Sequence, residues 1–158
     1  MQTFNPIKDA IEIYNKVYEG FLKTVINTSR KPSDVETSLR SRSREIPSLM
    51  QDIGLLGVSS FCFSKSECYN EFISHLLEGK KEQKDLINNI GVGYSIYLFL
   101  ILEGIKKTNL INVEVKDPYT TITEMGKELN KVRIVERMLI PYLSEIKRLC
   151  EGTLRSGE

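Results

Sequence analysis

Residues 94–102 have the sequence YSIYLFLIL, the most apolar stretch of this 158-residue chain. A helix that spans a membrane needs about 20 such residues, so this shorter run predicts a helix buried inside a protein and not a membrane anchor. The run lies in a helical pattern over residues 85–107. Gly91 and Gly93, near the start of that pattern, permit either a bend or a close contact with another helix.

The N-terminal part of the chain carries clear signals for two helices. Apolar residues recur at three- and four-residue steps up to Val25, and Asn5 with Pro6 is a good N-cap and first helical position, so the first helix should run to about Asn27. Residues 33–36, SDVE, have the form of a capping box that opens the second helix. Pro47 is expected to kink that helix or begin a new one, because proline lacks a backbone N–H.

Further helices are expected on either side of the apolar run. Gly54 should end a short helical piece that begins at Pro47, and helices over residues 55–65 and 67–78 should follow. Apolar and polar residues alternate weakly over residues 109–117. The sequence shows no second strand pattern that could pair with this segment, so we expect a loop or an isolated extension. A long apolar stripe, with Pro141 inside it, then predicts the C-terminal helices.

The sequence shows no alternation of strands and helices, so the predicted fold class is all-α. We expect a compact bundle of six or seven helices with proline kinks near Pro47 and Pro141. The chain should form a single helical domain over residues 1–158, with a frayed tail at about residues 153–158.

Composition excludes two extreme classes of protein. The chain has 22 Lys and Arg against 21 Asp and Glu, a net charge of +1, and 41% hydrophobic residues. These values exclude a strongly basic nucleic-acid binder and a disordered acidic tail. The balance is uneven along the chain, because residues 29–46 carry a local charge of +2 and residues 47–79 a local charge of −3. Adjacent patches of opposite charge suit stacking of copies head to tail.

Motifs for catalysis and for cofactors are weak. His75 is the only histidine, and an amphipathic helix explains its surroundings. The lone pair Gly91 and Gly93 follows no strand, so it does not predict a nucleotide site. Cys62, Cys68 and His75 lack a fourth ligand for zinc. We therefore expect no enzyme, no metal and no cofactor. The N-terminal residues MQTFN lack the features of a secretory signal, so we expect a cytoplasmic protein with reduced cysteines.

The strongest candidate binding residues are three closely spaced arginines. Arg40, Arg42 and Arg44 alternate with small serines, and guanidinium groups bind phosphates through paired hydrogen bonds. On a helix Arg40 and Arg44 share a face while Arg42 lies nearly opposite. A solvated helix face is the competing interpretation.

A second basic group is interleaved with glutamates at helical spacing. Its basic residues are expected to form ion pairs with those glutamates within the helix. The members of this group are Lys127, Lys131, Arg133 and Arg137.

The sequence of residues 42–65, RSREIPSLMQDIGLLGVSSFCFSK, resembles the most characteristic segment of one protein family. This family is the small, all-helical subunit of type III CRISPR ribonucleoprotein effectors, of the Cmr type or the related Csm type. The matching features are an arginine before a proline, an apolar pair, a Gly-Leu pair and an apolar helix that ends near a lysine. In this chain they are Arg44, Pro47, Leu49-Met50, Gly54-Leu55, the helix through Phe61 and Phe63, and Lys65.

The resemblance implies a non-catalytic structural subunit that functions in antiviral defence. Several copies would stack beside the filament that carries the guide RNA and would help to hold the guide–target duplex. The implied partners are other effector subunits, guide or target RNA, and neighbouring copies of the chain. By motif position the resemblance gives Arg44 and Lys65 as RNA contacts, and we add Arg40 and Arg42 from the arginine cluster. The alternative function is a helical protein-interaction adaptor or regulator that does not bind nucleic acid.

Overall fold

The computed structural model describes residues 3–79 and 84–156, and the regular elements in this part of the chain are all helical. The all-α prediction is therefore confirmed. In chain order the elements are α1 (Pro6–Val17), the π-helical turn η1 (Tyr18–Leu22), α2 (Lys23–Thr28), α3 (Asp34–Lys65), α4 (Tyr69–Glu78), α5 (Lys84–Ile87), α6 (Ile90–Thr108), α7 (Pro118–Lys127) and α8 (Leu129–Thr153).

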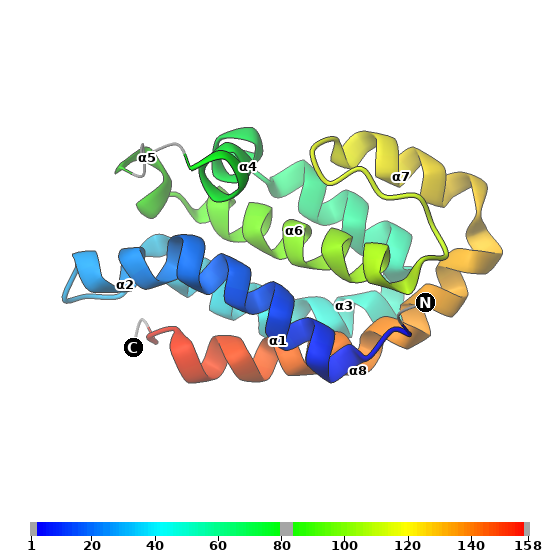
Figure 1. Ribbon diagram of the computed structural model, residues 1–158, viewed down its shortest axis with the longest axis horizontal. Coiled ribbons are helices and arrows are strands. Elements are labelled where there is room, and N and C mark those ends of the chain that lie inside the picture. The colour runs from blue at the N-terminus through cyan, green and yellow to red at the C-terminus, as the bar shows by residue number, and fades with distance from the viewer. Residues whose placement is uncertain (1–2, 80–83, 157–158) are drawn as a thin grey trace.

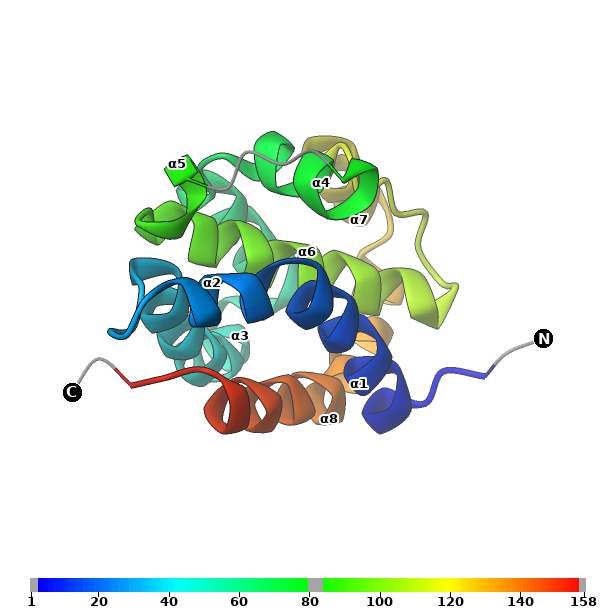
Figure 2. The ribbon, with the colours of Figure 1, turned by 60° about the vertical axis from the view of Figure 1, so that its left-hand side comes forward.

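Helix α6 occupies the centre of the molecule. Residues 95–102 are all buried, which confirms that the apolar run forms a core helix. Figures 1 and 2 show α6 with α4 and α7 on one side and with α1, the first part of α3 and α8 on the other. A helix with neighbours on several sides needs apolar residues around its whole circumference, which explains why this segment lacks a polar face.

Close contact at the start of α6 depends on its two glycines. A Cβ atom at Gly93 would overlap the Ser38 side chain, and one at Gly91 would lie 2.6 Å from the Cβ of Glu67. The Ser38 hydroxyl also donates a 2.8 Å hydrogen bond to the Ile90 carbonyl. The predicted helix over residues 85–107 is divided, because Asn89 has extended backbone angles and caps α6 through the Gly91 N–H.

Helix α3 reverses direction at Gly54, where φ is 77° and ψ is 173°. We call residues 34–53 its first arm and residues 55–65 its second arm, and Figure 1 shows the second arm returning along the molecule. Glu136 of α8 caps the second arm, because its Oε1 accepts a 2.6 Å hydrogen bond from the Leu55 N–H. The helix continues across Pro47, so no new helix begins there, and the predicted end of the helical piece at Gly54 is confirmed. Proline cannot adopt a positive φ, whereas glycine does so without strain.

By length and composition, α3 is the one helix in the described residues that could cross a membrane. Core side chains lie on both of its arms, including Val35 and Leu39 on the first and Leu55 and Val58 on the second. The burial of these side chains identifies α3 as part of the core.

The N-terminal caps form as the sequence predicts. The Asn5 side chain accepts a 3.1 Å hydrogen bond from the Lys8 N–H. Ser33 and Glu36 form the full capping box of α3, with hydrogen bonds of 3.1 Å and 2.8 Å. The first helix reaches Thr28, close to the expected end, although a π-helical turn interrupts it.

The C-terminal part of the chain packs more tightly than expected. Helix α8 is continuous across Pro141. Leu154 is buried, and Arg155 binds the Glu36 carboxylate with hydrogen bonds of 2.9 Å and 2.7 Å. The expected frayed tail is therefore wrong for residues 153–155, because a buried acid on α3 holds the end of the chain. Residues 157–158 of that expected tail lie outside the described residues.

The glycine contacts predict a stability difference between two Gly-to-Ala variants. Gly93→Ala should destabilise the protein by about 1–3 kcal/mol, since the added methyl group overpacks the contact with α3. Gly126→Ala is the matched control, because a Cβ atom at Gly126 in α7 meets nothing within 4 Å. The control should be neutral or stabilising by up to about 1 kcal/mol. Urea unfolding would measure both, and equal stabilities would contradict the close contact.

The Glu36–Arg155 pair predicts a pH-dependent contribution to stability. Burial alone would raise the pKa of Glu36, but hydrogen bonds from Arg155 and Ser33 outweigh burial and hold it below the ordinary value of 4.5. The charged carboxylate thus stabilises the fold above pH 4.5, and this stabilisation is lost as the pH falls through the depressed pKa. Arg155→Met should cost about 1–3 kcal/mol at neutral pH, and the loss should shrink in acid.

The control for this experiment is Arg148→Met, because Arg148 is an exposed arginine on α8 that pairs with Glu145 within the helix. Its effect should stay within about 0.5 kcal/mol. Unfolding free energies measured between neutral and acidic pH would test both variants. Equal losses for the two variants would show that the Glu36 contact does not hold the C-terminal segment.

Candidate nucleic-acid interface

The three predicted arginines lie on the first arm of α3 and divide between two surroundings. Arg40 and Arg44 reach toward the C-terminal end of α8, and Arg42 reaches toward α6. This division agrees with the expectation that Arg42 lies nearly opposite the other two. The four candidate residues therefore do not form one continuous basic surface.

Arg40 caps the C-terminal end of α8. Its Nη1 donates hydrogen bonds of 2.9 Å to the Glu151 carbonyl and 3.0 Å to the Leu154 carbonyl. The last carbonyls of a helix lack partners within the helix and carry partial negative charge, so a guanidinium group satisfies them well. The side chain is half-buried, and this cap gives Arg40 a structural role.

Arg44 is the most accessible of the three arginines. Its side chain is 51% exposed, and its Nε lies 3.1 Å from Oε1 of Glu151. An exposed pair of this kind is weak and is screened by salt, so a phosphate could replace the glutamate. Arg44 is thus available to an anionic partner.

Arg42 packs onto an aromatic ring. Its guanidinium carbon lies 4.5 Å from the centre of the Tyr94 ring, and the Phe61 ring meets Tyr94 edge-on at 6.0 Å. The side chain is 14% exposed and also pairs with Glu45 at 3.2 Å. Sequence analysis missed Tyr94, because the contact joins α3 to α6. A tyrosine paired with an arginine is a surface on which nucleic-acid bases stack.

Lys65 lies at the exposed end of the second arm and shares an open hollow with Tyr94. The hollow has a volume of about 360 Å³. Arg42 contacts the Tyr94 ring and Lys65 lines the same hollow as Tyr94, although the two cations are 23 positions apart in sequence. The carboxylates of Asp34 and Glu67 also line this hollow, so Lys65 does not stand in a purely basic environment.

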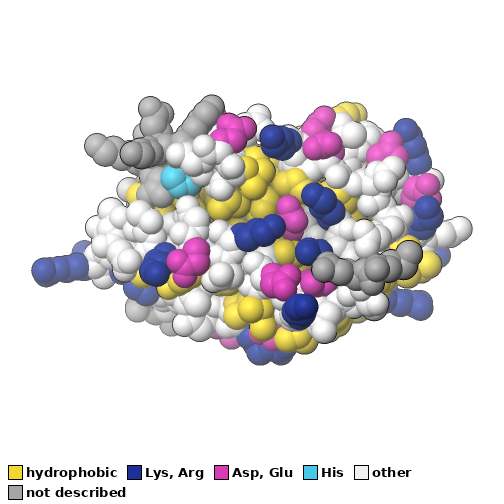
Figure 3. Space-filling view, viewed as in Figure 1, with side chains coloured by type: hydrophobic (Ala, Val, Ile, Leu, Met, Phe, Trp, Pro, Cys, Tyr) yellow, Lys and Arg dark blue, Asp and Glu magenta, His cyan; other side chains and the backbone are white. Residues whose placement is uncertain are grey.

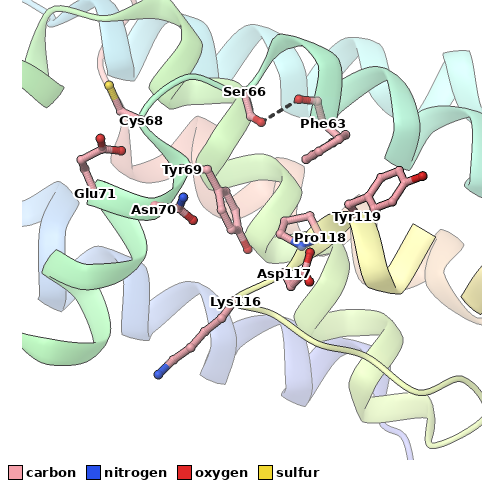
Figure 4. A pocket seen from close by; sticks show the side chains of 10 residues that line it. All are labelled: Phe63, Ser66, Cys68, Tyr69, Asn70, Glu71, Lys116, Asp117, Pro118 and Tyr119. Atoms are coloured by element: carbon pink, nitrogen blue, oxygen red, sulfur yellow. Dashed lines mark hydrogen bonds between the residues drawn. The ribbon is translucent and has the colours of Figure 1, made fainter. Parts of the chain in front are cut away.

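A second hollow, of about 670 Å³, lies at the same end of α3, between α4 and the start of α7. Figure 4 shows Phe63 and Tyr119 at one side of it and Glu71 at the other. The two rings lie 6.3 Å apart, and Tyr119 is 62% exposed. Exposed aromatic rings therefore flank the end of α3 that carries Lys65.

Other groups that sequence analysis singled out are packed into the fold. The His75 ring on α4 meets Phe21 edge-on at 5.6 Å. Burial raises the pKa of Cys62 to about 12, against a weaker opposing effect of Arg42, and burial likewise raises the pKa of Cys150 to about 12. Thiols with such pKa values are protonated and unreactive at neutral pH.

The surface charges mix both signs. On the face seen in Figure 3, basic and acidic side chains are interspersed with hydrophobic ones. In the second basic group, Lys127 and Lys131 pair with Glu124 and Glu128 at 3.4 Å, as the spacing predicts.

Comparison with known proteins gives a structural match alone. No protein-family model matches the sequence, and no curated protein matches it. The fold is similar over its whole length to a chain in the cryo-EM structure of the type III-B Cmr-beta complex bound to non-cognate target RNA. The TM-score is 0.72 at 21% identity, and the match covers 98% of this chain and 99% of that chain. The resemblance inferred from residues 42–65 is therefore confirmed at the level of the fold.

Proposed function

We propose that this chain is a non-catalytic structural subunit of a type III CRISPR RNA-guided effector complex. The observation that carries the proposal is the fold, which matches a chain of a Cmr-beta complex from end to end. The agreement of this match with the sequence motif around Pro47 and Gly54 supports the same assignment. Other effector subunits and RNA would then be its partners, and the cytoplasm its location.

In this proposal several copies stack along the guide–target RNA, and the expected basic face consists of separate basic side chains. Arg44 and Lys65 are exposed and serve as direct phosphate contacts. Arg42 contributes through Tyr94, which offers a ring for base stacking. Arg40 contributes indirectly, because it caps α8 beneath Arg44. Target cleavage belongs to other subunits, since His75 and the buried thiols are used for packing.

Salt-dependent RNA binding tests the two exposed contacts. Arg44→Gln and Lys65→Gln should each lower the slope of log K against log salt by about 0.7 to 0.9, since each removes one phosphate contact. Fluorescence anisotropy with a labelled single-stranded RNA and a duplex of equal length would measure the slopes. Lys127→Gln is the control, because Lys127 is exposed and paired on α7. Unchanged slopes in both test variants would refute the assignment of these residues.

The Arg40→Gln variant tests whether Arg40 stabilises the fold or binds RNA directly. The variant should lose about 1–3 kcal/mol of stability, because the carbonyls of Glu151 and Leu154 lose a charged donor. At temperatures below its unfolding transition, the slope of log K against log salt for RNA binding should stay close to that of the wild-type protein. Thermal unfolding and RNA titration of one preparation would measure the stability and the salt dependence. A smaller slope of log K against log salt with unchanged stability would show that Arg40 contacts RNA directly.

Purification distinguishes the proposal from the adaptor alternative. A subunit of an RNA-guided effector should copurify with small RNAs of fixed length and with other effector subunits. A helical adaptor should retain no RNA, and its partner binding should be insensitive to salt. Expression of the tagged chain in its native cell, followed by RNA extraction, would decide between them.

A further inference from the structure

We propose that an exposed ridge on α8, formed by Arg133, Arg137 and Ile140, docks an acidic surface of another protein. The proposed function names other effector subunits as partners without assigning a surface to them, and this inference assigns one such surface and the chemistry of its partner. The ridge is also separate from the arginines near Glu151. Arg137 lies about 20 Å from Glu151 along the helix.

The arginines of the ridge lack the acidic partners that the sequence predicts for them. Lys127 and Lys131 pair within the helices, but Glu136 turns to α3 and caps the second arm. In the described part of the chain, no carboxylate lies within 4 Å of Arg133 or Arg137. The contact of Glu136 with α3 thus removes the one glutamate that helical spacing places beside Arg133, and no acidic residue lies three or four positions from Arg137.

The geometry of α8 places these groups together. Arg133, Arg137 and Ile140 are separated by four and three residues, so they share one face of the helix. Ile140 is 52% exposed, and Ile134, at the edge of the same ridge, is 54% exposed. An exposed row of two arginines and Ile140 therefore runs along α8, with Ile134 about 100° around the helix from Arg133.

A hollow beside the ridge can accept an apolar side chain. It has a volume of about 180 Å³ and lies between α8 and the first arm of α3. Pro47, Met50, Ile140 and Leu143 contribute its apolar lining. The acidic side chain of Glu136 also borders this hollow, so the group that fits there is an apolar side chain and not a carboxylate.

These features favour an acidic protein surface over a nucleic acid. Arginine is enriched at the centres of protein interfaces, and apolar side chains give those interfaces their dry core. A phosphate backbone would use the arginines but would leave both isoleucines and the apolar hollow exposed. The fitting partner thus presents an apolar side chain flanked by carboxylates, which pair with Arg133 and Arg137.

A pair of synthetic peptides tests the proposal on the full chain. One peptide carries a leucine flanked on both sides by glutamates, and the other has lysines in place of the glutamates. The wild-type protein should bind the glutamate peptide alone, with NMR shifts at Arg133, Arg137 and Ile140. The double variant Arg133→Glu/Arg137→Glu should bind that peptide about tenfold more weakly and should gain affinity for the lysine peptide.

Two further variants separate the charged contact from the apolar one. Ile140→Ser should weaken binding of the glutamate peptide without creating affinity for the lysine peptide. The control Lys127→Glu/Lys131→Glu makes the same change in net charge at paired positions and should leave peptide binding unchanged. Circular dichroism would establish that each variant is folded.

Three results would overturn the proposal. The first is the absence of NMR shifts on the ridge at saturating glutamate peptide. The second is displacement of the peptide from Arg133 and Arg137 by a single-stranded RNA that binds there more tightly, which would make the ridge a nucleic-acid site. The third is loss of self-association in the Arg133→Glu/Arg137→Glu variant, measured by sedimentation, which would assign the ridge to a second copy of this chain.

Discussion

The hydrogen bond from the Leu55 N–H to Glu136 fixes the reversal of α3, and the rest of the molecule depends on that reversal. A straight helix of 32 residues would be about 48 Å long and would extend past the core. Gly54 supplies the positive φ, and Glu136 satisfies an amide at the start of the second arm, where the break removes the normal helical partner. Both arms can therefore pack against α6 and enclose its apolar surface.

The same reversal assembles the candidate RNA surface. Arg42 belongs to the first arm and contacts Tyr94 of α6, and Lys65, at the end of the second arm, lines the same hollow as Tyr94. The packing of these helices brings the three side chains together. The arginine cluster has a second use, since Arg40 caps α8 while Arg44 remains exposed beside it. Arg40 thus stabilises the fold, and its exposed neighbour Arg44 is the candidate for RNA contact.

Local features were predictable from the sequence, because each depends on a few adjacent residues. The capping box at Ser33 and the buried run of α6 are examples. Long-range contacts were not predictable. Arg155 and Glu36 are far apart in sequence and meet because α8 packs against α1 and α3. This contact holds a segment that looks like a polar tail in the sequence. The end of a helical piece at Gly54 was predictable, because glycine adopts a positive φ, but the reversal that packs both arms of α3 against α6 was not.

The nearly even totals of acidic and basic residues understate how basic parts of the surface are. A carboxylate that accepts hydrogen bonds from backbone N–H groups is held in place inside the fold. Glu136 binds the Leu55 N–H in this way, and Glu36 is enclosed by Ser33 and Arg155. The folded chain therefore uses several of its acids internally, while arginines on α8 remain exposed. A net charge of +1 is compatible with two separate anion-binding surfaces, because the fold determines which charges face solvent.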